Sequence, residues 1–277
     1  MTNSFNHFII TRFNLKQSIW EKDKMGYNVN NNDWLENRYA LFETYCFSSM
    51  IHQTLKNFKW LVYFDTNTPL IYKEKNKSLQ LKLPNFTPIY VSSFLDFEKE
   101  LPNDIEQYCS EQCDFILTTR LDNDDCFHKQ AVHVIQQHFK PIDKAIIDLK
   151  NGLVLKVFED HKLALKKETT SGPFITLIER YTSSNKPLTV YNREHLQWIG
   201  TATFIDVTMD YYWLQIIHKR NISNILKGEL TFNKKFLKGF EFDTIVKFKF
   251  KYYMFIILKK IKHFLLSRAD VLKQQTI

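Results

Sequence analysis

The segment from Phe115 to Asp125 constrains the fold more than any other part of the chain. It begins with an apolar, β-branched run and ends with three carboxylates within four residues, the acidic cluster Asp122, Asp124 and Asp125. The run predicts a buried strand with the acidic cluster at its carboxyl end. Carboxylates placed there are suitable ligands for Mg²⁺ or Mn²⁺ when a substrate phosphate fills other positions. Open α/β sheets bind nucleotides at this edge.

Strand-like and helix-like patterns alternate about four times before residue 150. This alternation predicts βαβ units and a largely parallel sheet flanked by helices. Asp65 ends the second expected strand, so we expect it on the same edge as the acidic cluster. The expected strands are Phe5–Arg12, Trp60–Phe64, Pro88–Val91, Asp114–Thr119, Ala145–Leu149 and Leu153–Phe158. The expected helices run from Asp33, as N-cap, to about Gln53, then over Asp104–Gln112 and Phe127–Phe139.

After residue 150 the alternation weakens into a mixed strand and helix region. Its candidate elements are Pro173–Glu179, His195–Gly200, Thr203–Val207 and Tyr211–Arg220. We expect this half to build the pocket for a second substrate. The last element reads as an apolar helix, on which we interpret His218 as a packed surface residue.

The formal net charge of +8 is concentrated near the C-terminus. Seven basic residues and no acid lie between Asp243 and Asp270, which leaves the rest of the chain near +1. This distribution indicates a basic tail over residues 244–277 and no groove for nucleic acid. Lysines alternate with aromatic and aliphatic residues there, which favours a helix lying on an anionic membrane surface. The alternative is a terminal helix packed on the domain.

The N-terminus has polar residues where a signal peptide would have an apolar region. The longest apolar run of the tail, Tyr252–Leu258, is far shorter than the roughly 20 residues that span a bilayer. We therefore expect a cytoplasmic protein, peripheral at the inner face of the membrane through its tail. The sequence does not indicate the oligomeric state.

The acidic cluster has other readings on residue types alone. Asp124 or Asp125 would cap the following helix in a solvated turn. An EF-hand is poorly supported because Phe127 stands where its loop requires glycine. An aspartyl-nucleophile phosphatase needs its carboxylate pair after the first strand, whereas this pair follows a middle strand.

Leu121 to Asp125, placed after a middle strand, resembles the Asp-x-Asp (DXD) segment of glycosyltransferases with the GT-A fold. The longer segment Thr119–Asp125 resembles a rhamnosyltransferase family, similar to glycosyltransferase family 2, that acts in bacterial cell-surface polysaccharide synthesis. Further segments match that family in order: Phe8–Asn14, Gln53–Thr54 with Phe58–Asp65, Pro173–Glu179, and Trp213–Asn224. The resemblance covers about residues 5 to 225. It implies one GT-A-like, Rossmann-type domain over residues 1–240, with a nucleotide-sugar half to about 150 and an acceptor half from 151.

The resemblance also implies roles for the residues around the acidic cluster. Asp124 would coordinate Mg²⁺ or Mn²⁺ directly, and Asp122 would contact the ribose of a nucleotide-diphosphate sugar or the metal through water. Asp125 would join the metal shell or cap the helix. Arg120 would pair with a phosphate or orient Asp122. A purely structural ion pair is the alternative for Arg120.

Other site residues follow from the same resemblance. Thr11 and Arg12 would lie beside the nucleotide base at the end of the first strand. Asp65 would accept a hydrogen bond from the base or ribose. His195 would bind the diphosphate or the metal, although a lone histidine is often structural.

An enzyme that inverts anomeric configuration needs a general base for the acceptor hydroxyl. The resemblance places a carboxylate near the start of a helix in the second half. Glu179 is the candidate, with Glu159 and Asp160 as competitors.

The sequence thus predicts a metal-dependent, inverting hexosyltransferase. It would move a sugar, with rhamnose as the candidate, from a nucleoside diphosphate to a cell-surface glycan such as lipopolysaccharide or to a lipid-linked acceptor. One alternative is a metal-dependent nucleotidyl- or phosphotransferase that uses the same carboxylates. Another is a non-enzymatic binding module at the membrane surface.

Overall fold

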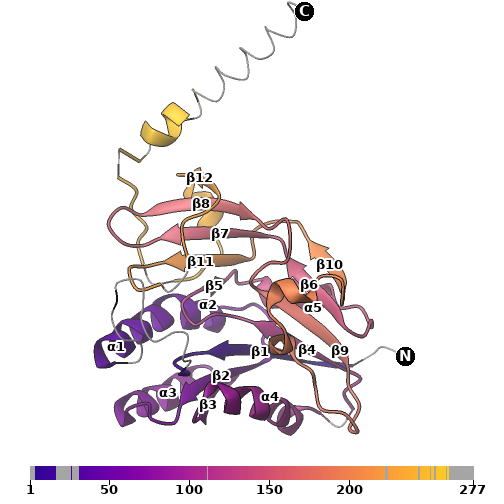
Figure 1. Ribbon diagram of the computed structural model, residues 1–277. Coiled ribbons are helices and arrows are strands. Elements are labelled where there is room, and N and C mark those ends of the chain that lie inside the picture. Colours follow the sequence, from indigo (N-terminus) through magenta and orange to yellow (C-terminus); the bar gives the residue numbers. More distant parts are fainter. Residues whose placement is uncertain are drawn as a thin grey trace, which may run out of the picture.

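The computed structural model describes residues 4–16, 26, 31–110, 112–221, 224–242, 244–249, 251–252, 254–259 and 261 (Figure 1). A seven-stranded sheet in the order β10-β6-β9-β4-β1-β2-β3 forms its centre. β9 runs antiparallel to both neighbours, and the other adjacent pairs are parallel. The predicted α/β fold with a mostly parallel sheet is therefore confirmed. The strands are β1 (Phe5–Arg12), β2 (Lys59–Asp65), β3 (Phe86–Val91), β4 (Phe115–Arg120), β6 (Ala145–Leu149), β9 (Ile175–Arg180) and β10 (Thr203–Val207).

Helices cover both faces of this sheet (Figure 1). One face packs against α1 (Asn32–Leu41), the π-helical turn η1 (Phe42–Phe47), α2 (Ser48–Ile51), α3 (Leu70–Lys82) and α5 (Ala131–Gln137). The other face packs against α4 (Phe94–Tyr108) and the short 3₁₀ helices η2 (Val190–Asn192) and η3 (His195–Trp198). Because alternate residues of a strand point to opposite faces, Ile9 joins the first core while Phe8 and Ile10 join the second.

A five-stranded sheet in the order β12-β8-β7-β11-β5 lies beside the central sheet, above it in Figure 1. Its strands are β5 (Cys126–Phe127), β7 (Asn151–Lys156), β8 (Lys162–Lys167), β11 (Trp213–Ile217) and β12 (Glu229–Thr231). A last 3₁₀ turn, η4 (Lys234–Leu237), follows it. β5 begins directly after the acidic cluster, so the cluster lies where the two sheets meet.

Several predicted elements differ from the structure. Asn31, not Asp33, caps α1, because its side chain accepts the backbone N–H of Trp34 at 2.8 Å. α4 begins at Phe94, well before the predicted Asp104, and α5 begins at Ala131 rather than Phe127. The helix expected over Tyr211–Arg220 is strand β11.

The start of the tail is attached to the second sheet. The Tyr252 hydroxyl donates to the carbonyl of Leu163 in β8 at 2.9 Å and accepts its N–H at 3.2 Å. Lys249 and Lys251 form ion pairs with Asp160 at 2.5 and 2.7 Å. The described part of the chain has no helix that is both long and apolar enough to span a membrane.

Candidate active site

Successive side chains of a strand point to opposite faces of the sheet, and this alternation decides which side chains meet at the carboxyl edge of the central sheet. β1, β2 and β4 are parallel, so their carboxyl ends lie together. Arg12, Asp65 and Arg120 share the strand face that packs on α4, as the positions of Ile10, Tyr63 and Ile116 in that core show. Thr11 points the other way, is fully buried, and accepts the indole N–H of Trp60 at 2.9 Å. The expected nucleotide contact of the Thr11 side chain is therefore not supported by its position.

The acidic cluster is attached to the end of β1. The Asn123 amide donates to the carbonyls of Arg12 and Phe13, both at 2.8 Å. Asp65 also lies at this edge, and its Oδ1 accepts the N–H of Asn67 at 2.7 Å. Its Oδ2 is buried without a hydrogen-bond partner among the described residues. A buried carboxylate oxygen left open in this way suits a ligand donor such as a base N–H or a ribose hydroxyl.

Asp124 is the most strongly paired carboxylate of the cluster. Its Oδ2 accepts hydrogen bonds from Arg38 Nη1 at 2.7 Å, His218 Nε2 at 2.9 Å and Asn221 Nδ2 at 3.5 Å. Burial acts to raise the pKa of Asp124, but Arg38 and His218 outweigh it and hold that pKa below its usual value. Asp124 is therefore an anchored carboxylate, fixed by side chains from α1 and the end of β11.

Asp125 has a different role. It is fully buried, and its Oδ1 accepts the N–H of Ile216 in β11 at 2.8 Å. Burial first, and then Asp124 and Asp122, raise the pKa of Asp125 well above its usual value, which favours the neutral form of this carboxyl. Helix α5 follows Gln130, so the reading of Asp124 or Asp125 as its cap is wrong.

Side chains of alternating charge lie in a row next to the acidic cluster. Arg120 Nε lies 3.6 Å from Asp122 Oδ1, and Arg120 Nη1 lies 3.2 Å from Glu194 Oε2. Arg12 and Arg120 both lie over the ring of Tyr191, with 4.8 and 5.4 Å from guanidinium carbon to ring centroid. Cations this close to an aromatic face are attracted by its quadrupole. This edge of the sheet therefore carries a positive pair that suits an anionic ligand.

His195 lies in η3, directly after Glu194. Burial and then the neighbouring Arg120 lower the pKa of His195, so its imidazole is neutral near pH 7. The structure therefore brings His195 near the row of charged side chains around Arg120.

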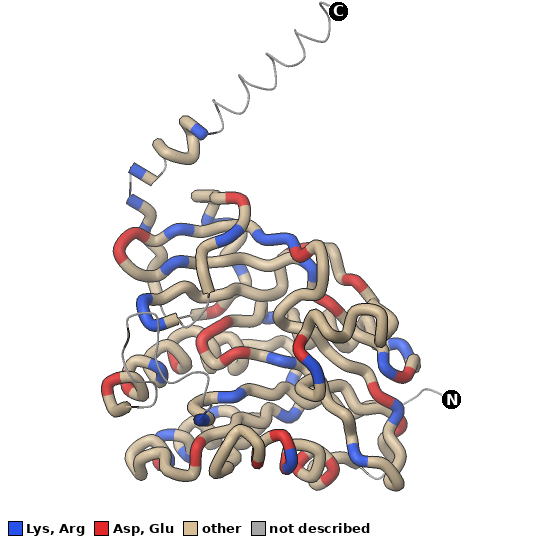
Figure 2. The backbone as a smooth tube through the Cα atoms, in the orientation of Figure 1, with Lys and Arg blue, Asp and Glu red and all other residues tan. Residues whose placement is uncertain are grey.

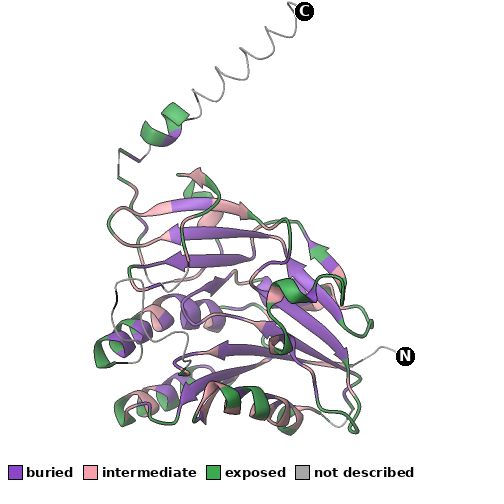
Figure 3. Ribbon diagram, in the orientation of Figure 1, coloured by how far each residue is buried: buried purple, intermediate pink, exposed green. Residues whose placement is uncertain are grey.

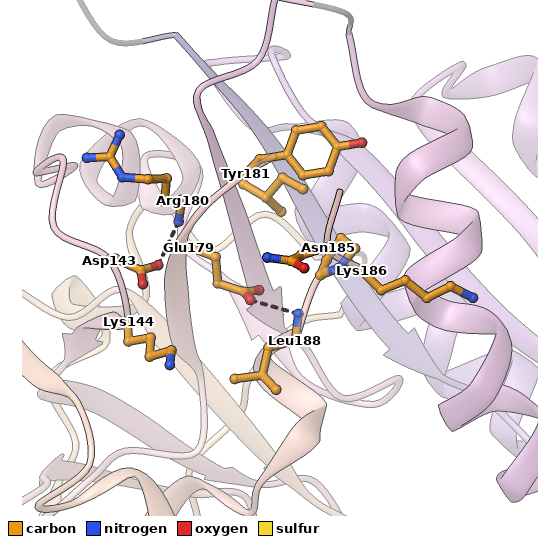
Figure 4. A pocket seen from close by; sticks show the side chains of 10 residues that line it. Asp143, Lys144, Glu179, Arg180, Tyr181, Asn185, Lys186 and Leu188 are labelled. Carbon is orange, nitrogen blue, oxygen red and sulfur yellow. Dashed lines mark hydrogen bonds between the residues drawn. The ribbon is translucent and has the colours of Figure 1, made fainter. Parts of the chain in front are cut away.

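Glu179 lies elsewhere. It belongs to strand β9, not to a helix start, and pairs with Ile116 near the amino end of β4. Its carboxylate accepts the N–H groups of Leu188 at 2.7 Å and Thr189 at 2.8 Å. It lines a cavity of about 310 Å³ with Lys144 and Lys186 among other residues (Figure 4). The structure does not bring Glu179 to the acidic cluster.

Sequence reasoning missed Arg38 and His218. The reading of His218 as a packed surface residue on a helix is wrong, because it is buried at the end of a strand and contacts Asp124. Two signals were available: Arg38 lies among apolar residues of the first helix, between Leu35 and Tyr39, and His218 directly follows an apolar run that ends at Ile217.

The described residues contain no group of three or more His, Cys, Asp and Glu side chains close enough to hold a metal ion. His218 contacts Asp124 through Nε2, and its Nδ1 accepts the N–H of Arg220 at 3.3 Å, so this histidine orients Asp124 and leaves the carboxylate as the potential ligand. Mg²⁺ in phosphoryl sites commonly uses one or two carboxylates and completes its shell with substrate phosphates and water. The donor set is therefore compatible with a cation that arrives with a diphosphate.

An Asp-Asn-Asp turn thus lies at the carboxyl edge of this sheet, beside two arginines and a carboxylate whose Oδ2 is buried without a partner among the described residues. A model of the family described as "putative rhamnosyl transferase" matches residues 5–230. The chain belongs to this family.

Solved structures of S. aureus TarS are distantly similar. TarS 1–349 in complex with UDP-GlcNAc gives a TM-score of 0.44 at 14% identity, covering 80% of this chain and 62% of that one. The complex with UDP gives 0.40 at 15% identity, covering 77% and 60%. The chain thus spans about three fifths of the length of these two TarS structures. No protein with curated annotation matches the chain.

Proposed function

We propose that the protein transfers a sugar, with rhamnose as the candidate, from a nucleoside diphosphate to a cell-surface glycan or lipid-linked acceptor. One observation carries the proposal. Asp124 is held as a charged carboxylate by Arg38 and His218 at the sheet edge where Asp65 keeps an open oxygen.

In this proposal, different residues at the carboxyl edge of the central sheet contact the base, the ribose and the diphosphate of a nucleotide sugar. Asp65 accepts a hydrogen bond from the base or ribose, and Asp122 contacts the ribose. Arg12 and Arg120 supply positive charge beside the diphosphate, which gains negative charge as the glycosidic bond breaks. Neutral His195 donates a hydrogen bond to a phosphate oxygen.

Asp124 is the residue we expect to hold Mg²⁺ or Mn²⁺, with Asp122 through water and His218 beside it. When bound, the cation stabilises the leaving diphosphate as a Lewis acid. Asp125 does not join this set in our proposal, because it is fully buried, its Oδ1 accepts the N–H of Ile216, and its raised pKa favours the neutral form. His218 replaces His195 as the proposed histidine near the metal.

We also propose that the tail contacts an anionic membrane surface. Beyond its attachment to β8 it exposes large apolar side chains: Met254, Phe255, Ile257, Leu258 and Ile261 (Figure 3). Lysines lie at both ends of the neighbouring strand β8, at the last position of β7 and at the start of the tail (Figure 2). An apolar surface flanked by lysine suits an anionic bilayer, where a lipid-linked acceptor would be found.

Product analysis tests the function. Incubation of the protein and Mn²⁺ with UDP-, dTDP- and GDP-linked sugars and a glycoside acceptor should release nucleoside diphosphate. Release of pyrophosphate would indicate a nucleotidyltransferase instead. The absence of either product across the donors would favour a binding module.

A further inference from the structure

The nucleotide sugar is proposed to bind at the carboxyl edge of the central sheet, which we call the donor edge. An inverting transfer needs a carboxylate that faces the acceptor from this edge. Such a base must keep an oxygen open to solvent, because the acceptor enters from there. The carboxylates already described do not meet this requirement. Asp65, Asp124 and Asp125 are all buried. Glu179 lies at the opposite edge, and both of its oxygens accept backbone N–H groups. Asp122 belongs to the segment proposed to hold the donor.

The competitors from the sequence are also engaged elsewhere. Glu159 pairs with Lys156 at 2.7 Å, between strands β7 and β8 of the second sheet. Asp160 pairs with Lys249 and Lys251 at the start of the tail. Both carboxylates therefore serve the second sheet and the tail rather than the edge of the central sheet.

The segment between β9 and β10 returns to the donor edge. The backbone N–H of Val190 donates to Thr118 Oγ1 in β4 at 2.8 Å. The Tyr191 hydroxyl donates to the carbonyl of Ile10 in β1 at 3.3 Å. These two contacts fix the segment against the ends of the strands that carry Arg12 and Arg120.

Glu194 is the carboxylate that this segment presents. One of its oxygens, Oε2, accepts a hydrogen bond from Arg120 Nη1 at 3.2 Å. The side chain is 66% exposed, in contrast to 10% for Asp124. Its backbone N–H donates to Gln197 Oε1 at 3.0 Å, which fixes the main chain at the start of η3. Glu194 is therefore positioned by Arg120 yet remains accessible from solvent.

From this geometry, and on the basis of the proposed function, we infer that Glu194 is the general base of the transfer. The acceptor hydroxyl oxygen forms a bond to the anomeric carbon while the bond from that carbon to the diphosphate oxygen breaks. The electron pair leaves with the diphosphate, and the hydroxyl proton passes to the Glu194 carboxylate. Arg120 is then the positioning residue that joins this base to Asp122 on the donor side.

The test compares Glu194→Gln with the matched variant Glu229→Gln, which changes an exposed carboxylate in β12. Both variants and the wild type are assayed with Mn²⁺, the UDP-, dTDP- and GDP-linked sugars and an octyl glycoside acceptor. Glu194→Gln should lower kcat by about 10²- to 10⁴-fold, the usual contribution of a general base, while UDP binding changes less than about twofold. Glu229→Gln should match the wild type.

Azide distinguishes a base from a structural residue, because this acceptor carries no proton to remove. Glu194→Gln should therefore form glycosyl azide at a rate close to that of the wild type. A kcat within about twofold of wild type for Glu194→Gln, or equal losses with azide and with the octyl glycoside, would overturn the assignment of Glu194 alone. Failure of the wild type to release nucleoside diphosphate from any donor would overturn the proposed function and this inference with it.

Discussion

Arg38 Nη1 lies 2.7 Å from Asp124 Oδ2, which joins helix α1 to the acidic cluster across 86 positions of sequence. Both side chains are nearly buried, at 8% and 10% exposed. A buried carboxylate that loses its cation is left with an uncompensated charge. This pair therefore links the ionisation of Asp124 to the stability of the fold.

Arg38→Met should lower the free energy of unfolding at pH 7 by about 3–5 kcal/mol, because it leaves a buried charge unpaired. The folded-state pKa of Asp124 is depressed, so its contribution is present above the unfolded pKa and is lost as the pH falls through the folded pKa. The difference between variant and wild type should therefore shrink toward pH 2. Urea unfolding at pH 7 and at low pH measures it, and a difference independent of pH would contradict the account.

His218→Gln should weaken Mn²⁺-dependent UDP binding about 10- to 100-fold, as expected when a side chain at or next to a metal ligand is lost. Calorimetric titration of UDP with and without Mn²⁺ measures the effect. His138→Gln is the control, because His138 is the C-cap of α5 and its side chain bonds only the carbonyl of Val134 among the described residues. Equal losses in both variants would speak against a site at His218.

Asp125→Asn should keep the fold and stabilise it near pH 7. The folded-state pKa of Asp125 is raised, so its stabilising contribution is complete below the unfolded pKa and declines as the pH rises toward the folded pKa. Asparagine keeps an acceptor for the N–H of Ile216 and never ionises. The gain over wild type should vanish below about pH 4, the ordinary Asp range, in thermal unfolding followed across pH. A variant less stable than wild type at pH 7 would show that the Asp125 carboxylate is charged.

Glu179→Gln should cost about 1–3 kcal/mol of stability, because an amide replaces one of two carboxylate oxygens that accept backbone N–H groups. Its kcat should stay within about twofold of wild type at a temperature where the variant is folded. A loss of kcat comparable to that of Glu194→Gln, with UDP binding intact, would restore Glu179 as the candidate base.

The tail gives a separate prediction. Replacing Phe255 and Leu258 together by serine should reduce sedimentation with phosphatidylserine vesicles at least tenfold, because two exposed apolar side chains are lost. Binding to neutral phosphatidylcholine vesicles should be weak for both proteins. Equal sedimentation of variant and wild type with the anionic vesicles would remove the proposed membrane contact.

The sequence predicted the bounds of some strands but not the type of every element, since the fully buried strand β11 was expected as a helix. The bounds of β1 and β6 match the prediction, because an apolar run between polar residues marks a buried strand directly. Helix α3 was missed, since Asn76 and Leu79 are its buried residues and two positions do not form an apolar stripe.

The candidate site was predictable only in part. Asp65 and the acidic cluster follow from the ends of strands, which parallel pairing brings to one edge. The contact of His218 with Asp124 joins residues 94 positions apart and depends on how the second sheet packs against the first. The placement of Glu179 failed because β9 runs antiparallel, which reverses the end at which its last residues lie.

The most direct test of the central claim is release of nucleoside diphosphate from the nucleotide sugars with Mn²⁺ by wild type and by Asp124→Asn. Asparagine keeps the size of the side chain and an oxygen for Arg38, so UDP-free thermal unfolding should still report a folded protein. We expect the wild type to release nucleoside diphosphate, and Asp124→Asn to release it at least 100-fold more slowly and to lose Mn²⁺-dependent UDP binding. Unchanged release by Asp124→Asn would contradict the assignment of the acidic cluster as the site of transfer.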